Sequence, residues 1–270
     1  MQLKDLVDDV LRKIGRNMML FQQLQYLLKF VVANGNLSGY SSKLKDIQAK
    51  RTESIHKQTM GQLVGQFLQN SDPDYQVFTN EPEVLKEAHI SLRFSIETNS
   101  ASHAAKKEAL AELVSQRNEL IHHLLPKFDT TSQTSCEELS IQLDAQSEII
   151  RREIKEVQSI AEALNQGRKQ LASYLTSDEG IKELMLNFLK QSRLAKILVD
   201  IANQLGNKDG WISLSLASHI IREHLPDELT LLRENYGHKT LKSFMLETEL
   251  FEFCEEETQK GGVRVLYKLC

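Results

Sequence analysis

The residues best suited to chemistry lie together in the segment at 117–123, which reads RNELIHH. A guanidinium holds phosphate groups or stabilises negative charge, and an imidazole exchanges protons near neutral pH. Apolar residues around the segment recur at three- and four-residue steps, which predicts a helix over about 102–125. Arg117 falls in the centre of the apolar stripe, and Asn118 and His122 lie on one flank of it. The spacing therefore favours the convergence of Arg117, Asn118 and His122 on one cleft.

The same residues also have a structural interpretation. An arginine aimed at a packed surface is costly unless an anionic or hydrogen-bonding group compensates it, and the many acids of this chain offer such a partner. Arg117 and His122 would then only stabilise a helical bundle or its interface. A buried carboxylate tied to Arg117 would favour this interpretation, whereas an open cleft in front of Arg117 and His122 would favour an enzyme.

The pattern Arg-Asn-x-x-x-His, late in a helix of a helical bundle, resembles the R-x(4-6)-H signature of the HEPN superfamily, many of whose members are metal-independent ribonucleases. The resemblance implies that Arg117 holds the scissile phosphate, that His122 acts as general base or acid, and that Asn118 orients the site. His123 also satisfies the spacing. The resemblance further implies an RNA substrate, because a 2′-hydroxyl attacks the phosphate, no metal or other cofactor, and a homodimer whose motif helices face each other. Some members of the superfamily are inactive scaffolds.

The elements that must position this segment are mainly α-helical. Only four prolines and twelve glycines interrupt the chain, and most of it follows a helical apolar period. A two-residue alternation at 90–96 instead predicts a strand, which we expect to pair with 75–79 in a small hairpin. We expect an N-terminal bundle of three or four long helices in antiparallel order, with helices over 3–32, 43–69, 102–125 and 135–173.

The sequence predicts two domains, because 270 residues exceed one typical domain and a polar, glycine-containing stretch at 176–180 separates two kinds of pattern. The first is a helical bundle over 1–177 and the second a small domain over 193–270, joined by a linker and connecting helix over 178–192. In the second domain three helices precede two strand-like runs at 250–254 and 263–268. This is the order of a winged helix-turn-helix with three helices and a β-wing.

The second domain is similar to the OST-HTH or LOTUS domain, a winged helix of RNA-regulating proteins. The similarity lies in the order of the turn at Gly210-Trp211, an apolar helix, the helix stop at Tyr236-Gly237 and the wing, over about 193–270. It implies RNA binding, although Trp211, Tyr236 and Phe244 are mostly core residues in the structural interpretation. The expected RNA contacts are scattered basic residues: Lys208, Arg233, His238, Lys239, Lys242, Lys260 and Arg264.

The charge balance gives no general attraction to nucleic acid. The net charge is −4, and from residue 190 onward eleven Lys and Arg stand against twelve Asp and Glu, which leaves 22 against 25 before it. Binding must therefore use a local patch or a shaped pocket. Acids also crowd the first strand of the wing, at 247–257, and should repel phosphate from that face.

The sequence lacks the signals that are typical of several other classes of protein. The sequence has no apolar run long enough for a membrane span and no secretory signal pattern at its start, so we expect a cytoplasmic protein without a membrane partner. Three distant cysteines indicate neither a disulfide framework nor a zinc site. Phosphate-loop, dinucleotide-binding and zinc-protease motifs are missing from the sequence.

The sequence thus favours an RNA-binding protein that acts as a metal-independent endoribonuclease. One alternative is a non-catalytic RNA-binding regulator or scaffold. Another is a DNA-binding winged-helix regulator with a helical dimerisation domain, which we rank last because the helix at 227–236 carries three acids against Arg233 alone. A regulatory protein partner is left unidentified by the sequence.

Overall fold

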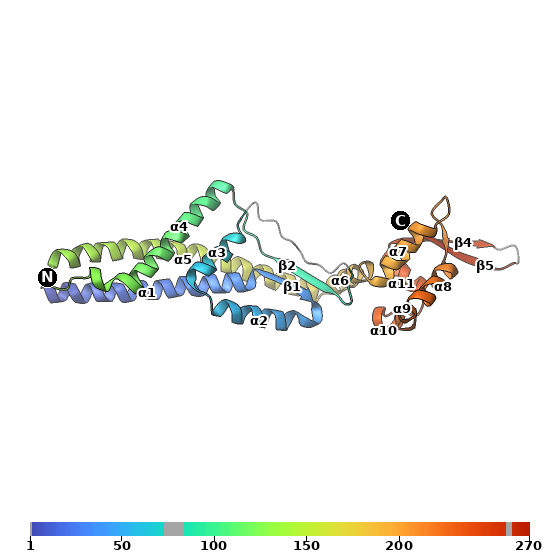
Figure 1. Cartoon of the computed structure of the whole chain (residues 1–270), viewed down its shortest axis with the longest axis horizontal. Helices are drawn as coiled ribbons and strands as arrows, with labels where there is room; N and C mark the ends of the chain where they lie inside the picture. The colour runs from blue at the N-terminus through green and yellow to red at the C-terminus, as the bar shows by residue number, and fades with distance from the viewer. Residues whose placement is uncertain (1, 73–83, 258–260) are drawn as a thin grey trace. The chain divides into compact units, whose positions relative to one another are not determined.

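The structure, a computed structural model, describes residues 2–72, 84–257 and 261–270. The chain is mainly helical, as expected, and divides into two compact units (Figure 1). The first unit combines Met1–Phe78 with Ile90–Leu171, and the second combines Thr79–His89 with Ala172–Cys270. In the part of the chain that the structure describes, no helix has the length and apolarity needed to cross a bilayer.

Two long helices, α1 (Leu3–Asn34) and α5 (Gln133–Leu175), form the frame of the first unit and lie side by side (Figure 1). They run parallel, because Lys13 near the start of α1 donates to Ser140 at 2.7 Å, and Arg168 near the end of α5 donates to Asn34. The expected antiparallel order is therefore wrong for this pair. The chain makes its return in between, along α4 (Ser100–Asn118), which runs opposite to α5.

The helix expected over 43–69 is two helices, α2 (Leu44–His56) and α3 (Met60–Gln69). Thr59 ends the continuity, because its hydroxyl accepts a hydrogen bond from the Gln62 N–H at 3.4 Å and the Gln62 side chain accepts one from the Thr59 N–H at 2.9 Å. This reciprocal capping starts a new helix at Met60 and turns its apolar face toward α1.

The strand expected at 90–96 is confirmed as β2 (His89–Arg93), but its partner differs from the expected one. It pairs with β1 (Asn36–Tyr40), a stretch for which no strand was expected. The expected partner at 75–79 lies outside the described residues.

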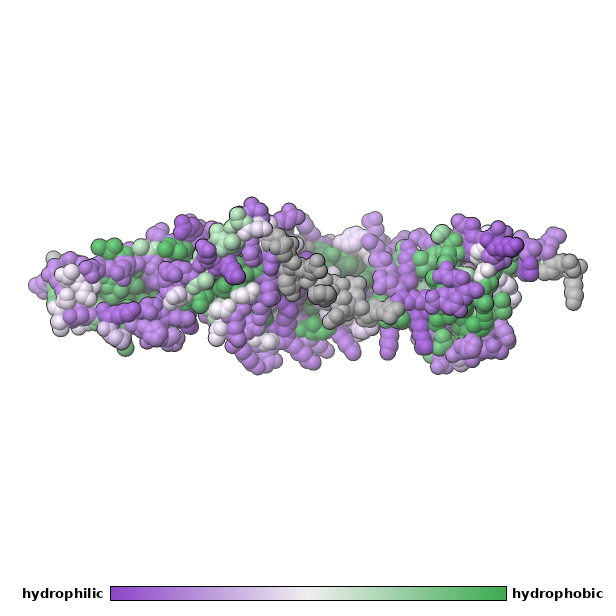
Figure 2. Space-filling model, turned by 45° about the horizontal axis from the view of Figure 1, so that its top comes forward, coloured by the Kyte–Doolittle hydropathy of each residue, from purple (hydrophilic) through white to green (hydrophobic). Residues whose placement is uncertain are grey.

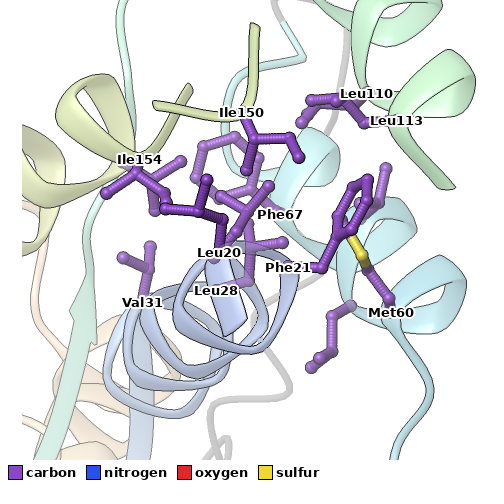
Figure 3. Packing of buried hydrophobic residues seen from close by; sticks show 14 of the residues in the cluster. Leu20, Phe21, Leu28, Val31, Met60, Phe67, Leu110, Leu113, Ile150 and Ile154 are labelled. Carbon is purple, nitrogen blue, oxygen red and sulfur yellow. The ribbon is translucent and has the colours of Figure 1, made fainter. Parts of the chain in front are cut away.

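The core of the first unit is built largely from α1, α3, α4 and α5, and α2 adds Ile55 (Figure 3). Burial of each large apolar side chain contributes about 1.5–3 kcal/mol, so this cluster sets where α4 lies against its neighbours. The position of α4 in turn sets where the segment at 117–123 emerges. The labelled core residues are Leu20, Phe21, Leu28 and Val31 from α1, Met60 and Phe67 from α3, Leu110 and Leu113 from α4, and Ile150 and Ile154 from α5.

The second unit combines short helices with a three-stranded antiparallel sheet in the order β3-β5-β4. Tyr267 in the central strand is fully buried, pairs with Ile212 and Phe253 in the two flanking strands, and donates to the Leu198 carbonyl at 3.2 Å. Its elements are α6 (Asp178–Lys190), α7 (Arg193–Leu205), β3 (Ile212–Ser213), α8 (Leu214–His224), α9 (Pro226–Thr230), α10 (Leu232–Tyr236), α11 (Leu241–Thr248), β4 (Phe251–Glu257) and β5 (Val263–Leu269).

The helix expected from Pro226 is divided at Leu231 into α9 and α10. The helix stop expected at Tyr236-Gly237 is confirmed, because Gly237 adopts a left-handed conformation with φ of 78°. On the face shown in Figure 2, hydrophilic residues cover most of the surface and hydrophobic residues form separate patches.

Candidate functional site

The segment at 117–123 lies where α4 changes its geometry. The α-helix ends at Asn118, the residues Glu119–His123 form a π-helical turn, and Leu125–Lys127 follow as a 3-10 turn. The expected α-helix over 102–125 is therefore wrong in its last third. A π-helix bonds each residue to the fifth one along, so Asn118 ends the regular α-helix and His122 lies in a turn of different geometry. Such turns are frequent at functional sites.

Arg117 is half-buried on the last turn of α4, between the buried Leu113 and Leu120. Its guanidinium donates to the Asn118 side-chain oxygen at 3.0 Å. Among the described residues it forms no ion pair. A structural role for Arg117 predicted a buried carboxylate as its partner. Within the described residues, Arg117 has no such partner.

His122 and His123 are both exposed, with ring centroids 6.2 Å apart in an edge-on arrangement. The neighbours of His122 are apolar and open, because Ile121 is 38% and Leu125 87% exposed. Solvent and a ligand therefore have access to the imidazole, and the apolar side chains beside it are available to a partner surface.

An ion pair connects the π-helical turn to the 3-10 turn that follows it. Lys127 on the 3-10 turn contacts the carboxylate of Glu119, the first residue of the π-helical turn. The hydrogen bond from Lys127 is the main reason that the pKa of Glu119 is lowered, and the nearby His123 adds to it. The pair joins the start of the π-helical turn to the end of the 3-10 turn that follows it.

A cleft of about 650 Å³ opens between α4 and α5 on the neighbouring side of the same turn. Glu119, Leu120 and Leu124 of the turn lie in its wall. The residues that line it do not include Arg117, Asn118 or His122. In the structure, Arg117 is hydrogen-bonded to Asn118 and His122 is exposed. The cleft is lined by neighbouring residues of the same turn and not by these three side chains.

The sequence did not point to this cleft. Its polar walls are the glutamines Gln116, Gln142 and Gln146 and the acids Glu112 and Glu138, residue types that are ordinary on exposed helix faces. These residues come together only because α4 packs against α5. The sequence of neither helix, taken by itself, predicts that contact.

The basic residues expected to contact RNA in the second unit fall into two groups. Lys208, Arg233 and Lys239 are exposed, and within the described ranges they form no ion pair. Lys242 instead lies 3.2 Å from Glu255, and Arg264 lies 2.6 Å from Glu256. Acids of β4 therefore pair with Lys242 of α11 and with Arg264 of β5.

The remaining expected contacts differ again. His238 is half-buried, with its ring edge against Phe244 at 5.9 Å between centroids. Lys260 lies outside the described residues. Tyr236 and Phe244 are buried core residues, whereas Trp211 is half-buried and Lys268 lies over its ring, 5.0 Å from the centroid.

No cluster of three metal-binding side chains occurs in the described parts of the chain. Comparisons with known proteins give no relative: no protein-family model, no curated protein and no solved structure matches the chain.

Proposed function

We propose that the chain is an RNA-binding protein and a metal-independent endoribonuclease of HEPN type, whose second unit is a LOTUS-like winged helix that selects the RNA. One observation carries the proposal. Arg117 has no carboxylate partner among the described residues, and the π-helical turn that begins two residues after it leaves His122 exposed. An arginine with a purely structural role in a packed surface would be expected to have an anionic partner.

The chemistry follows from these two side chains. His122, as general base, removes the proton from an RNA 2′-hydroxyl, whose oxygen attacks the adjacent phosphorus. The bond from phosphorus to the 5′-oxygen breaks, and that oxygen takes a proton from a second imidazole. Arg117 stabilises the charge that develops on the phosphoryl oxygens, and Asn118 holds the guanidinium through its side-chain oxygen. The products are a 2′,3′-cyclic phosphate and a 5′-hydroxyl end.

The second imidazole comes from a second copy of the chain. Two copies of His122, one from each protomer of a homodimer, divide the roles of base and acid. The exposed Ile121 and Leu125 beside His122 support this arrangement, because a dimer contact would remove their apolar surface from water.

The second unit supplies RNA recognition. Its element order, with a short strand before α8 and two strands after α11, fits a winged helix. The unneutralised Lys208, Arg233 and Lys239 are suited to phosphate contacts, whereas the acidic β4 turns RNA away from the wing. RNA with exposed bases fits such a surface better than duplex DNA, because bulk positive charge is lacking.

The test is incubation of the protein with labelled single-stranded and structured RNAs in EDTA. We expect cleavage by the parent, and a loss of at least about a hundredfold in Arg117→Ala and in His122→Ala. His56→Ala and Arg151→Ala, exposed residues of the same unit, serve as matched controls and should keep full activity.

If the parent bound RNA without cleaving it, the catalytic roles of Arg117 and His122 would be wrong, and the protein would be an RNA-binding scaffold. Absence of both binding and cleavage would contradict the proposal that the protein binds RNA.

A further inference from the structure

The cleft between α4 and α5 is a feature of the first unit that the proposed reaction does not use. Its volume of about 650 Å³ lies within the range of about 300–1,000 Å³ that is typical of small-ligand sites. The π-helical turn that carries His122 also forms part of the wall of the cleft, through Glu119 and Leu120.

A chain of hydrogen bonds orients the polar groups of the cleft. The fully buried Asn17 on α1 donates to the Gln146 side-chain oxygen at 2.8 Å. The Gln146 amide donates to Gln116 at 3.5 Å, and the Gln116 amide donates to Glu112 at 2.9 Å. The two glutamine side chains are therefore held in a chain of hydrogen bonds that ends on the Glu112 carboxylate.

The charges of the cleft decide which part of a nucleotide it accepts. Glu112, Glu119 and Glu138 line it, against the single cation Lys127, which already pairs with Glu119. Phosphate is therefore repelled, whereas groups that donate hydrogen bonds are attracted. Glu138 has no hydrogen-bond or ion-pair partner among the described residues, so both of its carboxylate oxygens are available.

The remaining walls are apolar. Leu120, Leu124, Leu139 and Ile149 give the cleft a surface against which a flat ring can pack. A flat, uncharged group with hydrogen-bond donors on its edge combines all of these requirements, and an unpaired nucleobase is such a group.

We propose that this cleft binds a guanine base of single-stranded RNA, with the Glu138 carboxylate accepting from the N1–H and the exocyclic amino group. Guanine presents two adjacent donors that match two carboxylate oxygens. Uracil presents one N–H between two carbonyl oxygens, which the carboxylates repel. Adenine and cytosine each place their amino group beside an acceptor nitrogen. The inference rests on the proposed function for the presence of RNA at this unit.

The test compares two fluorescently labelled strands, oligouridine and the same strand with one central guanosine. Both carry 2′-O-methyl groups, so that binding is measured without cleavage. We expect the parent to bind the guanosine strand about tenfold more tightly. Glu138→Gln should reduce this preference to less than about twofold, because an amide cannot accept with both of its polar atoms. Glu148→Gln, an exposed position on the same helix, is the matched control and should keep the preference.

Equal affinity of the parent for the two strands, or no binding of either, would overturn the guanine site. A preference that survives in Glu138→Gln would overturn it as well. The two proposals fail separately: a guanine preference without cleavage in EDTA removes the nuclease and keeps the site, whereas cleavage without a preference for guanine removes the site and keeps the nuclease.

Discussion

At the scale of single residues, the candidate site was only partly predictable. The types and order of Arg117, Asn118 and His122 are visible in the sequence, and the structure adds the bond from Arg117 to Asn118 and the exposure of His122. The π-helical turn was not predictable, because the residues at 119–123 contain neither glycine nor proline to mark a change of helix geometry. The expected α-helix ran through all three residues, whereas His122 lies in a π-helical turn that begins after Asn118.

A second residue-scale feature, the contact of α1 with α5, has consequences for pH dependence. The Asp144 carboxylate on α5 accepts from Lys13 at 2.5 Å and from Arg16 at 3.0 Å on α1. The hydrogen bond from Lys13 is the largest cause of the lowered pKa of Asp144, with a further contribution from Arg16. A lowered folded-state pKa means that the stabilisation is present above the unfolded-state pKa, and it is lost as the pH falls through the folded-state value.

We predict that Asp144→Asn lowers the free energy of unfolding at neutral pH by up to about 1 kcal/mol, a small value because Asp144 is half exposed. The difference from the parent should shrink toward zero as the pH falls below the ordinary carboxyl pKa of 3.8. Urea unfolding at several pH values measures it, with Glu148→Gln as control. A difference that stays constant across the pH range would contradict the assignment.

At the scale of elements, the helices and strands that follow a local apolar period were predictable from the sequence. The pairing and direction of elements that are distant in the sequence were not. The helix expected over 3–32 is confirmed as α1, and the alternation at 90–96 gave β2. The pairing of β2 with β1 was missed because Asn36–Tyr40 lacks an apolar alternation of its own. The parallel direction of α1 and α5 was missed because adjacent long helices are usually joined by short, antiparallel connections.

The break between α2 and α3 gives a prediction at the same scale. Thr59→Ala removes the hydroxyl that accepts from the Gln62 N–H, and we expect the free energy of unfolding to fall by about 1 kcal/mol. Thr59→Ser keeps the hydroxyl and should behave like the parent. Chemical denaturation of the three proteins checks this expectation. If the serine variant lost as much stability as the alanine variant, the capping hydroxyl would not be the cause.

At the scale of the whole molecule, the proposed reaction requires two copies of the chain, because one His122 supplies the base and the other the acid. Leu125 is the sharpest probe of that requirement. It is 87% exposed and adjoins the π-helical turn, so replacing it leaves the core of its own unit intact while changing the surface beside His122.

We predict that the parent sediments as a dimer and that Leu125→Glu sediments as a monomer, because burying a carboxylate without a partner at an apolar contact is unfavourable. Cleavage should fall with the dimer fraction, since an isolated protomer retains the base but loses the opposing acid. Leu205→Glu, at a half-exposed leucine of the second unit, is the matched control and should change neither property. A parent that is monomeric at all concentrations, yet cleaves RNA, would show that a single copy of Arg117 and His122 is sufficient and would remove the second imidazole from the mechanism.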